Sequence, residues 1–357
     1  MKPQHILAVH LLNDLSGSPR VLSQALSALS ENGFTVSLLT SEAEGGKSFL
    51  NELPIEKQFI SYQWNKNKWK TLARFFGAQW QMFKSVMNHK PSTVVYVNTL
   101  LPFGAALAAK LTGKKVVYHL HEVQINNPLL DGLLKWTMKK TANLIISVSD
   151  YLTTKANIKD VAVTTLPNSV SDKFFQSYSE VDLEYDGLML CNLKAYKGIY
   201  EYVALAKALP SQTFALVLNA SSSEVEEWRQ SIEIPSNLTL SSATTDVISW
   251  YLKSKVVLNL SRSNEWVETF GMTALEAMAL GKPVIVPTIG GIAHLVEEGI
   301  QGFHVESADL ERLKEKFLTL ISNKSRYLTY SGNAIDRAAQ YKPERFAEKI
   351  TEIFHIL

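Results

Sequence analysis

The stretch that decides the fold runs from residue 5 to residue 41 and reads HILAVHLLNDLSGSPRVLSQALSALSENGFTVSLLTS. Its two ends, residues 5–12 and 35–41, are short runs rich in apolar and β-branched side chains, which is typical of buried strands. Between them, residues 20–33 follow a helical pattern that closes on Gly33, and glycine commonly ends a helix. A strand, a helix and a second strand in this order predict a parallel βαβ unit.

The same alternation of strand and helix patterns continues along most of the chain. Further strands are expected at residues 93–99, 115–121, 144–150 and 161–170, and then at 188–193, 214–219, 237–242, 255–261 and 282–288. A polar passage at 167–187 separates the two series and suits a linker. The sequence therefore predicts an α/β protein with domains at 1–170 and 171–337, followed by an amphipathic helix at 338–357.

Length and composition fit this organisation. The chain has 357 residues, too many for one ordinary core, and its 46% hydrophobic and 20% charged residues are those of a soluble globular protein. The one cysteine, Cys191, cannot form an internal disulfide, which agrees with a reducing cytoplasm. The first residues favour a buried strand over a signal peptide, and no apolar run approaches the roughly 18 residues that span a bilayer. A cytoplasmic location is expected.

Charge is distributed unevenly along the chain. Residues 1–171 hold 18 Lys and Arg against 10 Asp and Glu, a net charge of +8, while the rest holds 18 against 24, a net charge of −6. From Lys57 to His121 there are ten Lys and Arg and no acidic residue. Such a surface should favour anions such as phosphates or lipid headgroups.

Two glutamates stand eight positions apart in the segment NEWVETFGMTALEAMALGKP, residues 264–283. Glu276 lies among apolar residues, where a carboxylate is costly unless it has a partner. If residues 268–276 were all helical, Glu268 and Glu276 would be separated by about 12 Å along the axis. That is more than the roughly 5 to 9.5 Å between the two carboxylates of a glycosidase. The pair therefore suits two ends of an extended ligand.

The residues between the two glutamates suggest what lies in the middle of that ligand. A glycine opens the helix, so the backbone N–H groups of Phe270, Gly271 and Met272 are expected to face outward, and helix N-termini attract phosphate. The alternative is purely structural: a glutamate at a helix start is common, and the second one can be a satisfied buried residue.

Residues 268–305 resemble the E-x7-E region of retaining, GT-B-fold glycosyltransferases of family 4. Further motifs of that family have counterparts in the same order along the chain: SGSPR at 16–20, YHLHE at 118–122, LPNSV at 166–170, LKAYKG at 193–198 and the C-terminal helix. The resemblance implies the GT-B fold, an α/β architecture of two Rossmann-like αβα domains facing each other across a cleft. The first domain would bind the acceptor and the second the nucleotide sugar, and the last helix would cross back to the first domain.

The resemblance also implies roles for individual residues. His121 and Glu268 would be the catalytic residues at the donor sugar, and Glu276 would hold the ribose. Lys197, Gly17 and the amides at 270–272 would meet the pyrophosphate, since lysine suits phosphate as a point charge. The full donor-binding set is Gly17, Asn192, Lys194, Lys197, Phe270, Gly271, Met272, Thr273 and Glu276.

Three positions depart from the family pattern. The family commonly has an arginine five residues before the lysine, where this chain has Asn192, with Lys194 near enough to substitute. The glutamate of the family's GG-x-P-E motif is replaced by His294, and the glycine of PNG by Ser169.

His121 has a plainer alternative role, because a histidine at a strand end is often only a satisfied polar residue. His119 is expected on the opposite strand face, so that only one of the two points to the ligand, and His121 is favoured because it lies nearer the carboxyl end. Arg20 follows Ser18 and Pro19, a good N-cap and N1 pair, and either steadies the first loop or is an ordinary helix-start arginine.

The acid-free stretch contains a helical pattern of aromatic and basic residues at 64–88. Cationic helices rich in Trp and Phe settle at membrane interfaces, whereas the alternative is a helix packed on its own sheet with a solvated basic back. The helix can pack on its own sheet along part of its surface while its Trp and Lys residues meet lipid. Peripheral contact with an anionic membrane is therefore expected. The residues assigned to this contact are Lys66, Lys68, Trp69, Lys70, Arg74, Trp80 and Lys84.

The function expected from these features is transfer of a sugar from a UDP-, GDP- or dTDP-linked donor to a glycan or lipid-linked acceptor in polysaccharide or glycolipid synthesis, with retention of configuration. No strand-ending D-x-D occurs, so no metal and no other cofactor is expected. A nucleotide-sugar epimerase, a phosphorylase, and a non-catalytic nucleotide-sugar-binding protein stay open as alternatives. A dinucleotide oxidoreductase is disfavoured because the first loop lacks G-x-G-x-x-G, and nucleic acid is disfavoured by the near-neutral net charge of +2.

Overall fold

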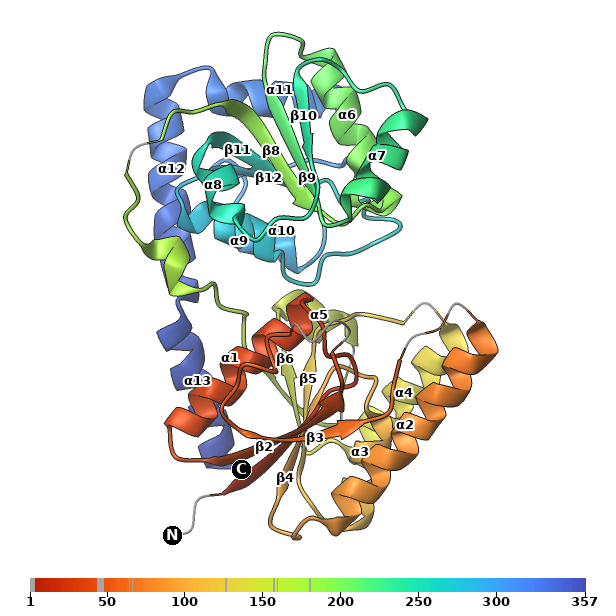
Figure 1. The fold of residues 1–357 in the computed structure, drawn as a ribbon. Helices are drawn as coiled ribbons and strands as arrows, with labels where there is room; N and C mark the ends of the chain where they lie inside the picture. The colour runs from red at the N-terminus through yellow and green to blue at the C-terminus, as the bar shows by residue number, and fades with distance from the viewer. Residues whose placement is uncertain are drawn as a thin grey trace. The chain divides into compact units, whose positions relative to one another are not determined.

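A computed structural model describes residues 4–43, 48–63, 65, 67–125, 127–156, 158, 160–179 and 181–357. The chain divides into two compact units. The first unit is Met1–Ser169 together with Pro343–Leu357, and the second is Val170–Lys342. Both units are α/β and each is built on one parallel sheet, which confirms the predicted fold class (Figure 1).

The first unit contains a seven-stranded sheet in the order β3-β2-β1-β4-β5-β6-β7, with every neighbouring pair parallel. Its strands are β1 (His5–Val9), β2 (Thr35–Ser41), β3 (Glu56–Ile60), β4 (Val94–Asn98), β5 (Val116–Leu120), β6 (Leu144–Ser147) and β7 (Ala162–Thr165). All residues of β4 and β5 are buried, as expected for strands covered on both faces.

Helices cover both faces of this sheet. They are α1 (Gly17–Glu31), α2 (Lys68–Asn88), α3 (Phe103–Leu111), α4 (Pro128–Thr141), α5 (Asp150–Ala156) and α13 (Pro343–Ile356). In Figure 1, α1 and α13 lie on one side of the sheet and α2, α3 and α4 on the other. The rings of Phe34 and Phe354 meet edge to face at 6.4 Å between α13 and the end of α1.

The last helix differs in extent from the expected range of 338–357. The preceding helix α12 runs to Ala338, and a 3-10 turn η4 (Ala339–Tyr341) follows it. Lys342 is extended because it precedes a proline, and Pro343 then suits the first turn of α13. The terminal helix is therefore shorter than predicted, and it belongs to the first unit.

The second unit contains a six-stranded sheet in the order β10-β9-β8-β11-β12-β13, again parallel throughout. Its strands are β8 (Tyr185–Cys191), β9 (Phe214–Leu218), β10 (Leu238–Ser241), β11 (Ser254–Leu258), β12 (Val284–Val286) and β13 (Gly302–His304). Its helices are α6 (Ile199–Ala208), α7 (Ser222–Ser231), α8 (Val247–Leu252), α9 (Met272–Ala279), α10 (Gly291–Leu295), α11 (Leu310–Ile321) and α12 (Lys324–Ala338), with short 3-10 turns η2 (Asp172–Phe175) and η3 (Ala195–Lys197).

The strand order of each sheet marks where a ligand would bind. The order reverses between β1 and β4 in the first unit and between β8 and β11 in the second. At such a reversal the loops after the two strands diverge, which opens a crevice at their carboxyl ends. Ligand-binding residues are therefore expected in the loops after β1, β4, β8 and β11.

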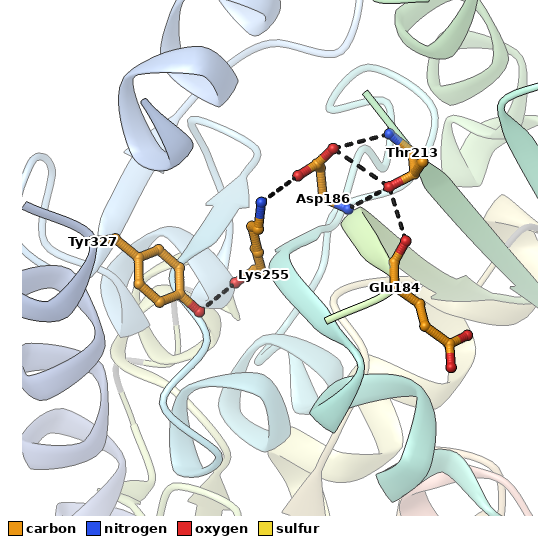
Figure 2. A network of polar contacts seen from close by, with 5 residues as sticks. All are labelled: Glu184, Asp186, Thr213, Lys255 and Tyr327. Atoms are coloured by element: carbon orange, nitrogen blue, oxygen red, sulfur yellow. Dashed lines mark hydrogen bonds and ion pairs between the residues drawn. The ribbon is translucent and has the colours of Figure 1, made fainter. Parts of the chain in front are cut away.

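The opposite end of the second sheet is held by polar contacts between strand starts, shown in Figure 2. Asp186 pairs with Lys255 at 2.7 Å and accepts the Thr213 backbone N–H at 3.0 Å. The Thr213 hydroxyl donates to the Glu184 carbonyl at 2.9 Å, and the Tyr327 hydroxyl donates to the Lys255 carbonyl at 3.1 Å. These contacts join β8, β9, β11 and α12 at the amino ends of the strands, so they stabilise the fold away from the crevice.

Candidate functional site

Lys197 is positioned by a tight turn after β8. The turn η3 ends at Lys197, and Gly198 follows with a left-handed φ of 81° before α6 begins. A Cβ at Gly198 would lie 2.1 Å from the Leu260 carbonyl oxygen, so only glycine permits this approach. The close approach places Lys197 beside the loop that follows β11.

Lys197 forms an ion pair with Glu268 in that loop. The Lys197 Nζ and Glu268 Oε1 atoms lie 2.5 Å apart, and only 14% and 17% of the two side chains are exposed. The Ser261 hydroxyl donates to the same oxygen at 2.8 Å. Burial alone would raise the pKa of Glu268, but the Lys197 charge and the hydrogen bonds from Lys197, Ser261 and Asn259 outweigh it and lower that pKa. Glu268 is therefore a carboxylate at neutral pH.

Two aromatic rings complete the surroundings of Lys197. Its Nζ lies 5.1 Å from the centre of the Trp266 ring and 5.8 Å from that of Tyr196. The two rings stack on each other at 5.2 Å. The ammonium group is thus held by a carboxylate and by cation–π contacts, which fixes a positive charge near the carboxyl ends of β8 and β11.

The helix α9 begins directly after this loop. Gly271 is its N-cap with a left-handed φ of 97°, and a Cβ there would lie 2.4 Å from Ile292 Cγ1. The helix starts at Met272, so Glu268 lies outside it and the helical spacing assumed for residues 268–276 does not apply. The N–H groups of a first helical turn have no acceptor within the helix and lie at the positive end of its dipole. The Gly291 N–H donates to the Glu268 carbonyl at 2.8 Å and holds the loop in place.

Glu276 lies one turn into α9 and is 7% exposed. The Tyr251 hydroxyl, from α8, donates to Glu276 Oε2 at 3.0 Å and also lies 3.3 Å from the Thr273 carbonyl oxygen. The sequence did not show what pairs with the buried carboxylate of Glu276; the Tyr251 hydroxyl is one such partner. Of the other predicted donor-binding residues, Met272 and Thr273 begin α9, whereas Phe270 and Gly271 directly precede it.

Asn192 and Lys194 lie between the end of β8 and the turn that holds Lys197. Both Asn192 and Lys194 are exposed; Asn192 accepts a hydrogen bond from the Asn219 amide at 3.0 Å. His294 is an exposed residue of the short helix α10, and its carbonyl oxygen accepts a bond from Arg337 at 3.0 Å. Roles for these three side chains in donor binding stay predictions.

In the first unit, His121 directly follows β5. Its Nε2 lies 2.9 Å from Oδ1 of Asn98, the last residue of β4. The Asn98 amide nitrogen lies 3.3 Å from the carbonyl oxygen of Ser18, which is next to Gly17 at the start of α1. Asn98 therefore contacts both predicted site positions of this unit, His121 after β5 and the start of α1 beside Gly17. Sequence reasoning missed it, although its place at a strand end beside the reversal of strand order was a usable signal.

The expectation that His119 and His121 lie on opposite faces was wrong. Their rings are 4.4 Å apart, because residues two apart in a strand point to the same side. His119 is fully buried, with its Nδ1 2.6 Å from the Tyr96 hydroxyl. Burial, with smaller contributions from His119 and His10, lowers the pKa of His121 well below its usual value. His121 is therefore neutral at physiological pH.

The start of α1 also differs slightly from expectation. The helix begins at Gly17 with Ser16 as its N-cap, two residues before the predicted cap at Ser18. Pro19 lies within the first turn, where its missing N–H costs nothing. Arg20 donates its backbone N–H to the Ser16 carbonyl at 3.4 Å, and its proposed support of the loop stays a prediction.

The helix α2 buries one stripe of its surface and exposes the rest. Phe75, Gln79, Met82 and Val86 are buried, whereas Trp69 is 81% and Trp80 57% exposed, together with Leu72, Phe76 and Met87. Lys70, Arg74 and Lys84 are exposed, and Lys84 lies over the Trp80 ring at 5.1 Å. Lys66 and the Lys68 side chain lie outside the described residues. Among the described residues, no helix combines the length and apolarity needed to cross a membrane.

Comparison with known families assigns both halves of the chain. The profile described as Glycosyltransferase Family 4 matches residues 15–173, and the profile described as Glycosyl transferases group 1 matches residues 171–337. An uncharacterized glycosyltransferase of Haemophilus influenzae is 22% identical over 351 residues, which is 95% of this chain and 96% of that protein.

Solved structures share the fold. HepE of Anabaena, in complex with UDP-glucose, superposes with a TM-score of 0.82 at 19% identity, covering 99% of this chain and 100% of that chain. WaaG, a glycosyltransferase involved in lipopolysaccharide biosynthesis, superposes with a TM-score of 0.74 at 16% identity, covering 98% of this chain and 99% of that chain.

The fold and the two family profiles define this chain as a transferase enzyme, a glycosyltransferase with the GT-B fold. Within that class it is a glycosyltransferase of the family 4 type, with the family 4 profile on its first half and the group 1 profile on its second.

Proposed function

We propose that this chain is a retaining glycosyltransferase that moves a sugar from a nucleotide-sugar donor to a glycan or lipid-linked acceptor. The observation that carries the proposal is the Lys197–Glu268 pair directly before α9. It combines a fixed cation, a carboxylate and a helix N-terminus at the reversal of strand order in the second sheet.

These three groups match the parts of a nucleotide sugar. The pyrophosphate carries negative charge, which Lys197 and the first-turn N–H groups of α9 attract. The carboxylate of Glu268, held beside Lys197, accepts hydrogen bonds from hydroxyl groups of the sugar. Glu276 holds the ribose from its buried position in α9. The complexes of HepE with UDP-glucose and with UDP support a UDP-linked donor.

The same charges support bond cleavage without a metal. As the bond to the anomeric carbon breaks, negative charge grows on the leaving phosphate, and preorganised cations and N–H groups stabilise it. In the proposed reaction the bond between the anomeric carbon and the leaving phosphate breaks, the acceptor oxygen forms its bond to that carbon on the same face of the sugar, and the departing phosphate takes the acceptor's proton, so the configuration is retained. Asn192 and Lys194 add polar and positive groups beside the Lys197 turn.

We assign donor binding to the second unit and acceptor binding to the first. His121, a neutral imidazole of the first unit, is a catalytic residue in this proposal. The likeness to WaaG, an enzyme of lipopolysaccharide biosynthesis, supports a role in cell-surface polysaccharide or glycolipid synthesis.

Peripheral membrane contact through α2 is part of this proposal. The exposed Trp69 and Trp80 are amphipathic rings that suit the headgroup region, and Lys70, Arg74 and Lys84 supply positive charge for anionic lipid. The buried stripe of α2 packs on its own unit, and in this proposal the exposed side of the same helix contacts lipid.

A thermal-shift screen of UDP-, GDP- and dTDP-sugars tests donor binding, because a ligand that binds only the native state raises its melting temperature. A donor that stabilises the protein is then assayed for transfer with glycan and lipid-linked acceptors in EDTA. Transfer with a retained anomer supports the proposal. Activity that is lost in EDTA and restored by Mg²⁺ or Mn²⁺ contradicts the metal-free mechanism.

The same assay separates the alternative functions. Free sugar, sugar phosphate or an epimerised nucleotide sugar formed without an acceptor indicates an epimerase or phosphorylase. Donor binding without turnover on any acceptor indicates a binding protein.

Vesicle co-sedimentation tests the membrane contact. The wild type should sediment with anionic vesicles more than with neutral ones, and the W69A/W80A/K70E variant should lose this difference. Replacing Trp228, which is buried on α7, by Phe is the matched control. Equal sedimentation of the wild type with both kinds of vesicle contradicts the proposal.

A further inference from the structure

Trp266 presents an open aromatic surface next to the Lys197–Glu268 pair. It is 41% exposed, although it lies only two positions before Glu268 in the same loop. Its ring stacks on that of Tyr196, with 5.2 Å between the ring centres and 23° between the ring planes. One face of the indole is therefore covered, and the exposed area belongs to the other face and the rim.

Lys197 does not occupy that open face. Its Nζ lies 5.1 Å from the centre of the Trp266 ring and 5.8 Å from the centre of the Tyr196 ring. Since the two ring centres are themselves 5.2 Å apart, the three points form a nearly equilateral triangle. An ammonium group on the open face would lie much farther from Tyr196 than from Trp266. The ammonium group therefore lies beside the stacked pair, on the Tyr196 side of the indole.

Backbone contacts hold the indole in this place. The Trp266 N–H donates to the Arg262 carbonyl at 2.8 Å, and the Arg262 N–H donates to the Tyr196 carbonyl at 2.8 Å. The Arg262 guanidinium pairs with Glu201 at 2.7 Å and with Glu265 at 2.9 Å. The loop that carries Trp266 is thus tied to the turn that carries its stacking partner. An aromatic surface that is held in place before binding loses little freedom when a ligand covers it.

A sugar ring has the two kinds of surface that this arrangement matches. Its hydroxyl groups lie on the rim and form hydrogen bonds, whereas its C–H groups form apolar faces that pack on aromatic rings. Lys197 contacts both the Glu268 carboxylate and the indole, so a ring whose hydroxyls reach Glu268 lies within reach of Trp266. Small-molecule sites commonly combine aromatic walls with a few polar groups that fix the orientation of the ligand.

We propose that Trp266 is a stacking surface for the donor sugar, which packs a C–H face on the indole while Glu268 accepts hydrogen bonds from its hydroxyls. The donor sugar is preferred to an acceptor sugar because it is joined directly to the phosphate that Lys197 binds in the proposed function. The role of Trp266 rests on that proposed function and adds to it a residue that neither the sequence pattern nor the family resemblance singled out.

Calorimetry with UDP-glucose and with UDP separates the sugar from the nucleotide. Trp266→Ala should weaken UDP-glucose binding by roughly 5- to 20-fold, as expected for the loss of one aromatic contact, and change the affinity for UDP by less than about twofold. Equal weakening of both ligands would mean that the indole only supports Lys197, and would overturn the proposal.

Trp250→Ala is the matched control. Trp250 also stacks on a tyrosine of the same unit, Tyr185, with ring centres 5.7 Å apart. Tyr185 begins β8, so this pair lies at the amino end of the strand, away from the Lys197 turn. The control should leave both affinities within about twofold of the wild type. A loss of UDP-glucose affinity as large as that of Trp266→Ala would indicate a general effect on the fold and would overturn the proposal.

Fluorescence gives a second measurement in a variant that keeps an aromatic ring at this position. Trp266→Phe should bind UDP-glucose and UDP within about threefold of the wild type. UDP-glucose should change the tryptophan fluorescence of the wild type more than that of Trp266→Phe, because only the wild type has an indole under the sugar, and UDP should produce no such difference. Equal responses of the two proteins to UDP-glucose overturn the proposal.

Transfer kinetics distinguish the donor sugar from an acceptor sugar. With UDP-glucose as donor, Trp266→Ala should raise KM for the donor and leave KM for the acceptor within about twofold of the wild type. A raised KM for the acceptor alone would place the indole in an acceptor site and overturn the proposal.

The same measurements separate this role from the proposed function. A wild type that binds neither UDP-glucose nor UDP refutes the proposed donor, and the role of Trp266 fails with it. If the wild type binds both ligands and Trp266→Ala leaves both affinities unchanged, the role of Trp266 fails while the proposed function stands.

Discussion

Replacing Lys197 by methionine removes the ammonium group and keeps most of the side-chain stem. In the wild type this group lies 2.5 Å from Glu268, and the two side chains are only 14% and 17% exposed. The variant therefore leaves Glu268 as a buried carboxylate that keeps its bond from Ser261 but has lost its countercharge.

The expected cost follows from burial. Removing one partner of a buried ion pair costs about 3–5 kcal/mol, and because part of each side chain reaches solvent we expect the lower end, about 3 kcal/mol at pH 7. For a unit of this size, about 1 kcal/mol shifts the melting temperature by roughly 2–4 °C, so Lys197→Met should lower it by roughly 6–12 °C.

The difference between wild type and variant should depend on pH. In the folded wild type the pKa of Glu268 is lowered, so the group adds stability above its unfolded pKa, and this stability is lost as the pH falls through the folded pKa. Without Lys197, burial raises the pKa of Glu268, and protonation then relieves the buried charge. The gap in unfolding free energy between the two proteins should therefore narrow as the pH falls toward about 4.

The assay is denaturant unfolding of the wild type, Lys197→Met, Glu268→Gln and the double variant at pH 7. The double variant removes both charges and should recover most of the loss, to within about 1 kcal/mol of the wild type. A double variant whose cost equals the sum of the two single costs would refute the reasoning. So would a Lys197→Met variant as stable as the wild type.

Three further predictions concern single residues. Glu276→Gln should weaken UDP binding by about tenfold or more, because a hydrogen bond to a charged group is worth about 1.5–3 kcal/mol; unchanged affinity in calorimetry contradicts the ribose role. Gly271→Ala should destabilise the protein by about 1–3 kcal/mol, because its φ is 97° and its Cβ would lie 2.4 Å from Ile292 Cγ1; an unchanged melting temperature argues against this geometry. Asp186→Ala should cost about 1–3 kcal/mol of stability through Lys255 and Thr213 and leave the donor KM unchanged, because it lies at the amino ends of the strands; a shifted KM would contradict that placement.

Much of the fold followed from hydrophobic pattern alone, because buried parallel strands read as continuous apolar runs. β4 and β5 are buried throughout and were predicted. β3 and β13 were missed, since β3 is a short edge strand with the polar sequence EKQFI and β13 has three residues. The sequence of β3 therefore contains no continuous apolar run, and β13 is too short to show one.

The candidate site was predictable only in its residue types. The resemblance to family 4 singled out Lys197, and the sequence around Glu276 together with that resemblance singled out Glu268; the structure adds that the two residues pair. Their partners Ser261, Trp266 and Tyr196 carry no sequence signal of their own, because contacts between loops far apart in the chain depend on the turns between them. Local periodicity does not encode these distances.

The central claim is that Glu268 acts on the sugar of a nucleotide-sugar donor while other groups bind the nucleotide. The most direct test measures sugar transfer and UDP binding by the wild type and by Glu268→Gln under the same conditions. We predict that kcat falls by about 100-fold or more while the affinity for UDP changes by less than about threefold. Transfer by Glu268→Gln at a rate near that of the wild type would contradict the account.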